Sequence, residues 1–122
     1  MAKSVLIVED NDHLRQILAS ILRFSGYEIL EARTGIQAIE KALAGKPNLI
    51  LLDLDLPDMT GIATAKAIKK NSTTARIPII ACSAWSRGDL REEALQAGMV
   101  DYLQKPIPSE IIKAKIEEFI VP

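Results

Sequence analysis

Short apolar runs alternate with stretches of helical periodicity along the whole chain. Between the runs, apolar residues recur three or four positions apart, which is typical of amphipathic helices. The pattern therefore predicts strands that alternate with helices. The strands are expected at residues 5–8, 27–32, 49–52, 77–82 and 100–103.

Each expected strand is followed by a helix. The first helix is marked by a stripe from Leu14 to Leu22, with Asn11 or Asp12 able to cap its start and Gly26 able to stop it. The third is expected at about residues 60–70. The others are marked by Ile36, Ile39 and Leu43, by Leu90, Ala94 and Ala97, and by Ile112, Ile116, Phe119 and Ile120.

Alternating strands and helices predict a parallel sheet covered on both faces. The first, third and fourth strands are almost wholly apolar, as expected of central strands, whereas the second and fifth carry Glu28, Glu31 and Asp101 and suit the edges. We therefore expect an α/β, flavodoxin-like (βα)5 three-layer sandwich whose five-stranded parallel sheet has the order 2-1-3-4-5.

Composition narrows the class of protein. The 122 residues are 48% apolar and 25% charged, which suits a single globular domain spanning residues 1–122 with no output domain. The formal net charge of −1 argues against direct nucleic-acid binding. No segment approaches the roughly 18 apolar residues of a membrane span. With a single cysteine, Cys82, and no signal peptide, the chain is expected to be cytoplasmic.

Polar side chains follow four of the five expected strands. In a parallel sheet of this order, ligands bind beyond the carboxyl ends of the strands, between the first and the third. These positions should therefore share one edge of the molecule. They are Glu9 and Asp10 after the first strand, Asp53 and Asp55 after the third, Ser83 after the fourth and Lys105 after the fifth.

Carboxylates gathered in this way repel one another. At about 4 Å and an effective dielectric near 20, each like-charged pair costs on the order of 4 kcal/mol, so their pKa values rise or a cation lies among them. Mg²⁺, or Mn²⁺, suits such oxygen ligands and commonly serves phosphate chemistry. Asp53 lies mid-cluster and is the candidate nucleophile toward phosphorus, although spacing alone does not separate a nucleophile from a metal ligand.

Four motifs together resemble the receiver domain of a two-component response regulator, the family of the chemotaxis regulator and of other single-domain response regulators. The resemblance extends from Ser4 to about Ile120. The motifs are VEDN at residues 8–11, DLDLPDMTG at 53–61, SA at 83–84 and GMVDYLQKP at 98–106.

The resemblance implies a role for each matching residue. Asp53 would accept a phosphoryl group from a histidine kinase or a histidine phosphotransfer protein. Lys105 would pair with that group, and the peptide bond before Pro106 would be cis. Ser83 would hydrogen-bond a phosphoryl oxygen and Tyr102 would turn inward, as the two switch residues. Mg²⁺ would be held by Glu9, Asp10, Asp53 and the main-chain carbonyl of Asp55.

As a whole, the resemblance implies a signalling receiver rather than an enzyme, one that assists its own phosphorylation and dephosphorylation. The signal would leave through the fourth helix, fifth strand and fifth helix toward an unknown downstream protein. The chain would be a monomer or a weak phosphorylation-dependent dimer, acting away from membranes.

Glu9 departs from the commonest family pattern: it is longer than the usual aspartate and would reach the metal through water. Two further positions, Asp55 and Trp85, could tune the rates of the site. Asp55 adds a carboxylate two residues beyond Asp53, where it would orient a hydrolytic water or repel phosphate. Trp85 lies two residues after Ser83 and would shield the site.

Three alternative functions remain open on sequence grounds. A flavin-binding protein of the same strand order needs a neutral, phosphate-cradling loop where this chain has the acids of residues 9–12. An Asp-x-Asp phosphatase would use Asp53 and Asp55, but its motif follows the first strand and it usually carries a cap domain. A receiver that no longer takes phosphate would serve only as a docking module.

Overall fold

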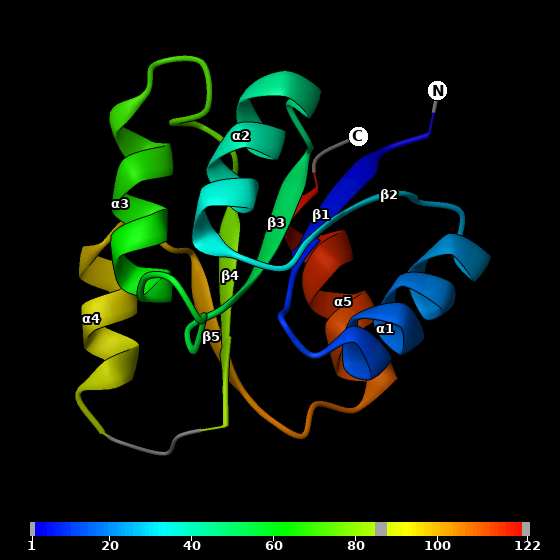
Figure 1. Ribbon diagram of the computed structural model, residues 1–122. Coiled ribbons are helices and arrows are strands. Elements are labelled where there is room, and N and C mark those ends of the chain that lie inside the picture. The colour runs from blue at the N-terminus through cyan, green and yellow to red at the C-terminus, as the bar shows by residue number, and fades with distance from the viewer. Residues whose placement is uncertain (1, 85–87, 121–122) are drawn as a thin grey trace.

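The computed structural model describes residues 2–84 and 88–120, which alternate strictly between strands and helices (Figure 1). The strands are β1 (Ser4–Val8), β2 (Glu28–Ala32), β3 (Leu49–Asp53), β4 (Ile79–Ser83) and β5 (Asp101–Gln104). The helices are α1 (Asp12–Phe24), α2 (Gly35–Gly45), α3 (Gly61–Lys70), α4 (Leu90–Gln96) and α5 (Ser109–Phe119). The predicted number and order of elements are confirmed.

The strands form one parallel sheet in the order β2-β1-β3-β4-β5, as predicted. Its register aligns the carboxyl ends. Val8 pairs with Leu52, Asp53 with Cys82, and Ser83 with Gln104. The residues that follow β1 and β5, Glu9 and Lys105, therefore emerge at the same edge as Asp53.

Helices cover both faces of the sheet, which gives the three predicted layers. Helices α1 and α5 lie on one face, and α2, α3 and α4 lie on the other (Figure 1). Alternate residues of the central strands face the two layers: Val5 and Ile7 pack toward α1 and α5, whereas Leu6 and Val8 pack toward α2, α3 and α4. Because the central strands are buried on both faces, their sequences are apolar without interruption.

The apolar stripe of the first helix is only partly buried. Leu14 and Ile17 are 48% and 45% exposed, whereas Arg15, Ala19 and Leu22, spaced at i, i+4 and i+7, are buried. The helix thus packs a charged residue, a small residue and one leucine of the stripe against the sheet. The other apolar side chains of the stripe line a groove that α5 also lines.

None of the helices within residues 2–84 and 88–120 is both long enough and apolar enough to span a bilayer.

Candidate functional site

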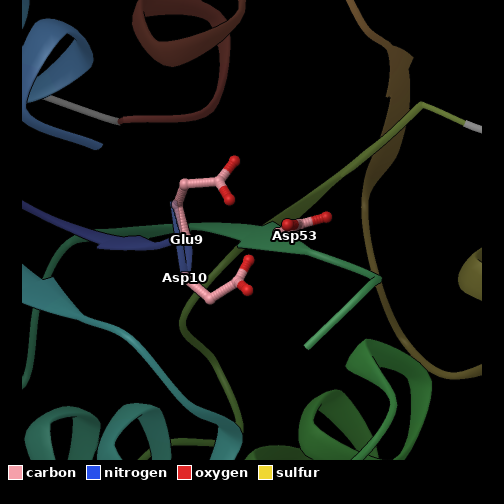
Figure 2. Close-up of side chains that lie close together, drawn as sticks. All are labelled: Glu9, Asp10 and Asp53. Carbon is pink, nitrogen blue, oxygen red and sulfur yellow. The ribbon is translucent and has the colours of Figure 1, made fainter. Parts of the chain in front are cut away.

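Three carboxylates converge at the carboxyl edge of the sheet. Figure 2 shows Glu9 and Asp10 at the end of β1 beside Asp53 at the end of β3. Each offers an oxygen, and these three oxygens lie within 4.8 Å of one another, the only such acidic group in the described part of the chain. Glu9 and Asp53 are buried and Asp10 is exposed. The predicted acidic cluster therefore exists, with one side open to water.

Asp53 ends the fully buried strand β3, which neighbours β1 in the sheet, so its carboxylate lies beside those of Glu9 and Asp10. Its Oδ1 accepts a hydrogen bond from the main-chain N–H of Asp55 at 3.1 Å. Its Oδ2 lies 3.4 Å from the Nζ of Lys105. The carboxylate is thus fixed in orientation while facing a cation.

Glu9 is held more tightly than Asp53. Its Oε1 accepts a hydrogen bond from Lys105 Nζ at 2.5 Å, and its Oε2 accepts one from the main-chain N–H of Asn11 at 3.2 Å. The extra methylene of glutamate lets the side chain reach across to Lys105. Burial by itself would raise the pKa of Glu9, but these hydrogen bonds outweigh it and lower the pKa.

The pKa of Asp53 moves in the opposite direction. Burial raises it from 3.8 to about 6, and the nearby Glu9 carboxylate adds to the shift, whereas the hydrogen bond from Asp55 and the charge of Lys105 only partly oppose it. In the absence of a metal, Asp53 is therefore the member of this pair that is protonated first as the pH falls. A divalent cation among the three oxygens would favour the ionised form of Asp53.

Ser83 and Lys105 complete the edge from β4 and β5. Ser83 is fully buried, and its Oγ lies 3.5 Å from Asp55 Oδ2. Its main-chain carbonyl accepts a hydrogen bond from the main-chain N–H of Lys105 at 2.8 Å. The Lys105–Pro106 peptide bond is cis, as the resemblance implied.

The remaining predicted residues lie at the margin of the site. Tyr102 is half-buried in β5, and its main-chain N–H donates to Asp101 Oδ1 at 2.8 Å. Asp55 is exposed beside Ser83. Trp85, predicted to tune the reaction rate, lies outside the described residues.

Two residues near the site have structural roles that the sequence analysis missed. The carboxylate of Asp58 accepts the main-chain N–H groups of Gly35 and Ile36 at 2.8 and 3.0 Å, which ties the β3–α3 loop to the start of α2. Arg15 donates to the main-chain carbonyl of Glu9 at 2.8 Å. The sequence offered one indication that Arg15 is buried: it precedes Ala19 by four positions and Leu22 by seven, so the three residues share one face of the helix.

Comparison with protein families decides the identity of the fold. The family model of the response regulator receiver domain matches residues 5–117. The chain is a response regulator receiver domain. Among curated relatives, the polar-differentiation response regulators DivK of Brucella anthropi and Brucella ovis are each 36% identical over 107 residues, which is 88% of this chain and 87% of those proteins.

Solved receiver structures superpose closely on this receiver. The chemotaxis protein CheY4 of Vibrio cholerae is 27% identical, with a TM-score of 0.92 over 98% of this chain and 99% of that one. The receiver domain of a sensor histidine kinase from Pseudomonas aeruginosa is 35% identical, with a TM-score of 0.90 over 98% of each chain. The latter structure has a magnesium ion coordinated in its active-site cleft.

Membership of the receiver family fixes the general role. Receiver domains are signalling modules rather than enzymes in the usual sense, they bind Mg²⁺ at an acidic pocket, and they interact with histidine kinases or phosphotransfer proteins. The flavin-binding and Asp-x-Asp phosphatase interpretations belong to other families and are therefore dropped.

Proposed function

We propose that this receiver accepts a phosphoryl group on Asp53 in the presence of Mg²⁺. The position of Asp53 is the observation that supports this most strongly. Its carboxylate is buried beside the acidic side chains of Glu9 and Asp10, and the Lys105 ammonium lies 3.4 Å away. A nucleophilic carboxylate needs such a cation nearby, because the incoming phosphoryl oxygens are negatively charged.

The donor set fits Mg²⁺. Glu9, Asp10 and Asp53 offer hard carboxylate oxygens, and Asp10 is exposed, so open positions remain for water and for phosphoryl oxygens. The main-chain carbonyl of Asp55 would be a further ligand. When bound, the ion would neutralise the three carboxylates and the charge that develops on the phosphoryl group. Mn²⁺ has similar ligand preferences and would serve as a substitute.

The transfer itself is a simple displacement. An oxygen of ionised Asp53 forms a bond to phosphorus while the bond from phosphorus to the donor's histidine nitrogen breaks, and the histidine leaves with that electron pair. Lys105 and Ser83 are placed to hold the phosphoryl oxygens. This receiver thus assists its own phosphorylation and, later, the hydrolysis of the resulting aspartyl phosphate, without turning over a separate substrate.

An apolar groove beside Asp53 supports a protein donor. The groove has a volume of about 530 Å³, and Glu9, Asp53 and Lys105 form part of its lining. Its walls are apolar side chains of α1, of the segment leading into α5 and of α5 itself, namely Leu14, Ile17, Leu18, Ile21, Ile107 and Ile112. A histidine kinase or histidine phosphotransfer protein would cover the exposed side chains of this wall, Leu14 and Ile17, while its phosphohistidine reaches Asp53.

The output is proposed to be a change of packing at α4, β5 and α5. A phosphoryl group adds about −1.5 to −2 charges and new hydrogen-bond acceptors beside Ser83. Ser83 would move toward it, Tyr102 would turn inward, and the equilibrium between two packings would shift. A downstream protein would read that surface, with this receiver acting as a monomer or a weak phosphorylation-dependent dimer.

The test is phosphorylation by acetyl phosphate or phosphoramidate with and without Mg²⁺, followed by intact mass spectrometry. The parent should gain one phosphoryl group per chain only with Mg²⁺, and Asp53→Asn should gain none. Glu28→Gln, an exposed acid at the start of β2, serves as the control and should behave as the parent. A parent that is never modified would instead favour the docking-module interpretation, and labelling of Asp53→Asn would remove Asp53 from its role.

A further inference from the structure

Arg15 is a buried charged residue at the back of the acidic cluster. Only 7% of its surface is exposed, and it lies on the face of α1 that packs against the sheet. The phosphotransfer chemistry proposed above does not use it. A buried guanidinium is expected only where its N–H groups are well partnered.

Three separate parts of the chain receive hydrogen bonds from this one guanidinium. Nη1 donates to the main-chain carbonyl of Glu9 at 2.8 Å, and Nη2 donates to Asp12 Oδ1 at 2.7 Å. Nε donates to Glu31 Oε1 in β2 at 3.1 Å. The end of β1, the start of α1 and the neighbouring strand are thereby joined through a single planar group.

The exposed carboxylate of the cluster, Asp10, lies between two of these anchored residues. Arg15 fixes the main chain at Glu9 on one side and the carboxylate of Asp12 on the other. The main-chain N–H of Arg15 also donates to the carbonyl of Asn11 at 3.0 Å. The four-residue turn that carries both Glu9 and Asp10 is therefore held at its two ends and near its middle.

We propose that Arg15 is a positioning residue that presets the turn bearing Glu9 and Asp10 for a divalent cation. This inference rests on the proposed Mg²⁺-dependent function. Arginine suits the role because its rigid fork holds three acceptors in fixed directions, whereas the single ammonium of lysine does not. Groups behind the metal ligands commonly change metal affinity about 10–100-fold when they are altered.

The charge of Arg15 and its positioning role predict opposite changes in cation affinity when the residue is replaced. Arg15 carries a positive charge close to the cluster, so its charge by itself weakens cation binding, and neutralising it should tighten binding. Loss of the fork should weaken binding, because the turn must then be ordered when the ion binds. The direction of the change therefore separates the two effects.

Two variants and one control exploit this difference. Arg15→Lys keeps the charge and removes the fork, and Arg15→Gln removes both. Arg23→Gln is the matched control, since Arg23 forms an ion pair with the same Glu31 at 3.2 Å but is half exposed. We expect Mg²⁺ to bind about tenfold more weakly to both Arg15 variants. Arg23→Gln should stay within about twofold of the parent, since an exposed ion pair contributes little.

Mg²⁺ affinity is measured by isothermal titration calorimetry, with urea unfolding in EDTA on the same samples. A merely structural role would lower the unfolding midpoint and leave the affinity of the folded protein unchanged. Phosphorylation by acetyl phosphate adds a second readout: the Mg²⁺ concentration for half-maximal rate should rise in Arg15→Lys, while the rate at saturating Mg²⁺ should recover. Parent-like affinity in Arg15→Lys, or tighter binding in Arg15→Gln, would overturn the inference.

The parent protein provides a test that needs no variant to fold. The Nε–H of Arg15 should give a protected NMR signal in EDTA that Mg²⁺ leaves in place, because the fork is formed before the ion binds. A signal that appears only with Mg²⁺ would contradict a preset turn. If the parent itself bound no Mg²⁺, the proposed function would fail, whereas normal binding in the parent and in Arg15→Lys would remove only the role of Arg15.

Discussion

Glu9 and Asp53 lie side by side at the end of the sheet, yet their pKa values shift in opposite directions. The difference comes from Lys105, whose Nζ is 2.5 Å from Glu9 and 3.4 Å from Asp53. Lys105 therefore stabilises the ionised form of Glu9, and burial leaves Asp53 the more easily protonated of the two. The metal-free site thus opposes ionisation of Asp53, the proposed nucleophile.

This raised pKa predicts that Asp53→Asn stabilises the metal-free protein. A carboxyl whose pKa is higher in the folded state, about 6 against 3.8, contributes stability below pH 4 that is lost as the pH rises through 6. At pH 7.5 the neutral amide should therefore raise the free energy of unfolding by on the order of 3 kcal/mol. The gain should shrink toward pH 4. Urea unfolding in EDTA across this range measures it, and a gain that grows toward acid pH would contradict the assigned shift.

Asp55 is expected to shorten the lifetime of the phosphorylated form. Its carboxylate lies beside Ser83 at the exposed rim of the site, where it would orient a hydrolytic water or repel the phosphoryl group. In either case Asp55→Asn should slow dephosphorylation by about fivefold, the equivalent of roughly 1 kcal/mol. Decay of the phosphorylated mass after removal of the donor measures this, with Glu28→Gln as control. An unchanged decay rate would exclude both roles.

At the scale of the elements, the loop from β3 to α3 is fixed within its length and at its far end. Asp58 holds it to the start of α2, and Gly61 begins α3 directly against the main chain at the end of β3. A Cβ on Gly61 would lie 2.5 Å from the Cα of Leu54 and 2.7 Å from the carbonyl oxygen of Asp53. Backbone atoms cannot yield as a flexible side chain would, so this contact requires glycine.

Gly61→Ala should accordingly destabilise the protein by about 1–3 kcal/mol, the usual cost of overpacking, and slow phosphorylation by displacing the carbonyl end of β3. Gly88→Ala is the control, because a Cβ there meets nothing within 4 Å. Urea unfolding and the acetyl phosphate reaction measure the two effects. Equal stability of both variants would show that the loop moves freely.

The hydrophobic pattern predicted which elements form but not how each helix is turned. Spacing located α1 and α2 correctly, yet Ile36 is 59% exposed while Ala38 and Ala42 are buried. Periodicity reports that a helix has an apolar side. Which side approaches the sheet depends on how close the neighbouring strands allow the helix to come, and small residues such as alanine permit the closest approach.

The site was predictable where it depends on topology alone. Strand order brings the residues after β1, β3, β4 and β5 together, so the cluster of Glu9, Asp10 and Asp53 followed from the sequence. The closer contact of Lys105 with Glu9 than with Asp53 did not, because it is decided by a difference of about 1 Å between side chains from separate strands. The contact of Arg15 with a main-chain carbonyl could not be predicted either, because every residue carries such a carbonyl.

At the scale of the whole molecule, repulsion among the site carboxylates opposes folding, so the bound cation should stabilise the protein. A ligand that binds only the folded state adds about 2.7 kcal/mol at a hundredfold excess over its Kd. Mg²⁺ should therefore raise the thermal unfolding midpoint, EDTA should reverse the change, and Asp10→Asn should greatly reduce it. A thermal unfolding midpoint of the parent that does not change with Mg²⁺ would argue against a metal site.

Phosphorylation should also change the packing of α4 and β5, with Ser83 as the connecting residue. Asp101 of β5 lies between Lys115 of α5, at 2.7 Å, and Arg91 of α4, at 3.7 Å, so the three elements of the proposed output surface share one charged contact. Phosphorylation of the parent should change amide hydrogen exchange in α4 and β5. Ser83→Ala should still be labelled but lose most of this change. An identical exchange response in Ser83→Ala would place the relay elsewhere.

The groups of the site are supplied by positions spread from residue 9 to residue 105. During synthesis, the acids of the first half of the chain therefore exist before the lysine that restrains them. A nascent chain that ends before β5 would expose an uncompensated anionic edge with no cation for incoming phosphoryl oxygens. On the proposed function, the ability to accept a phosphoryl group would therefore arise only once the last strand has joined the sheet.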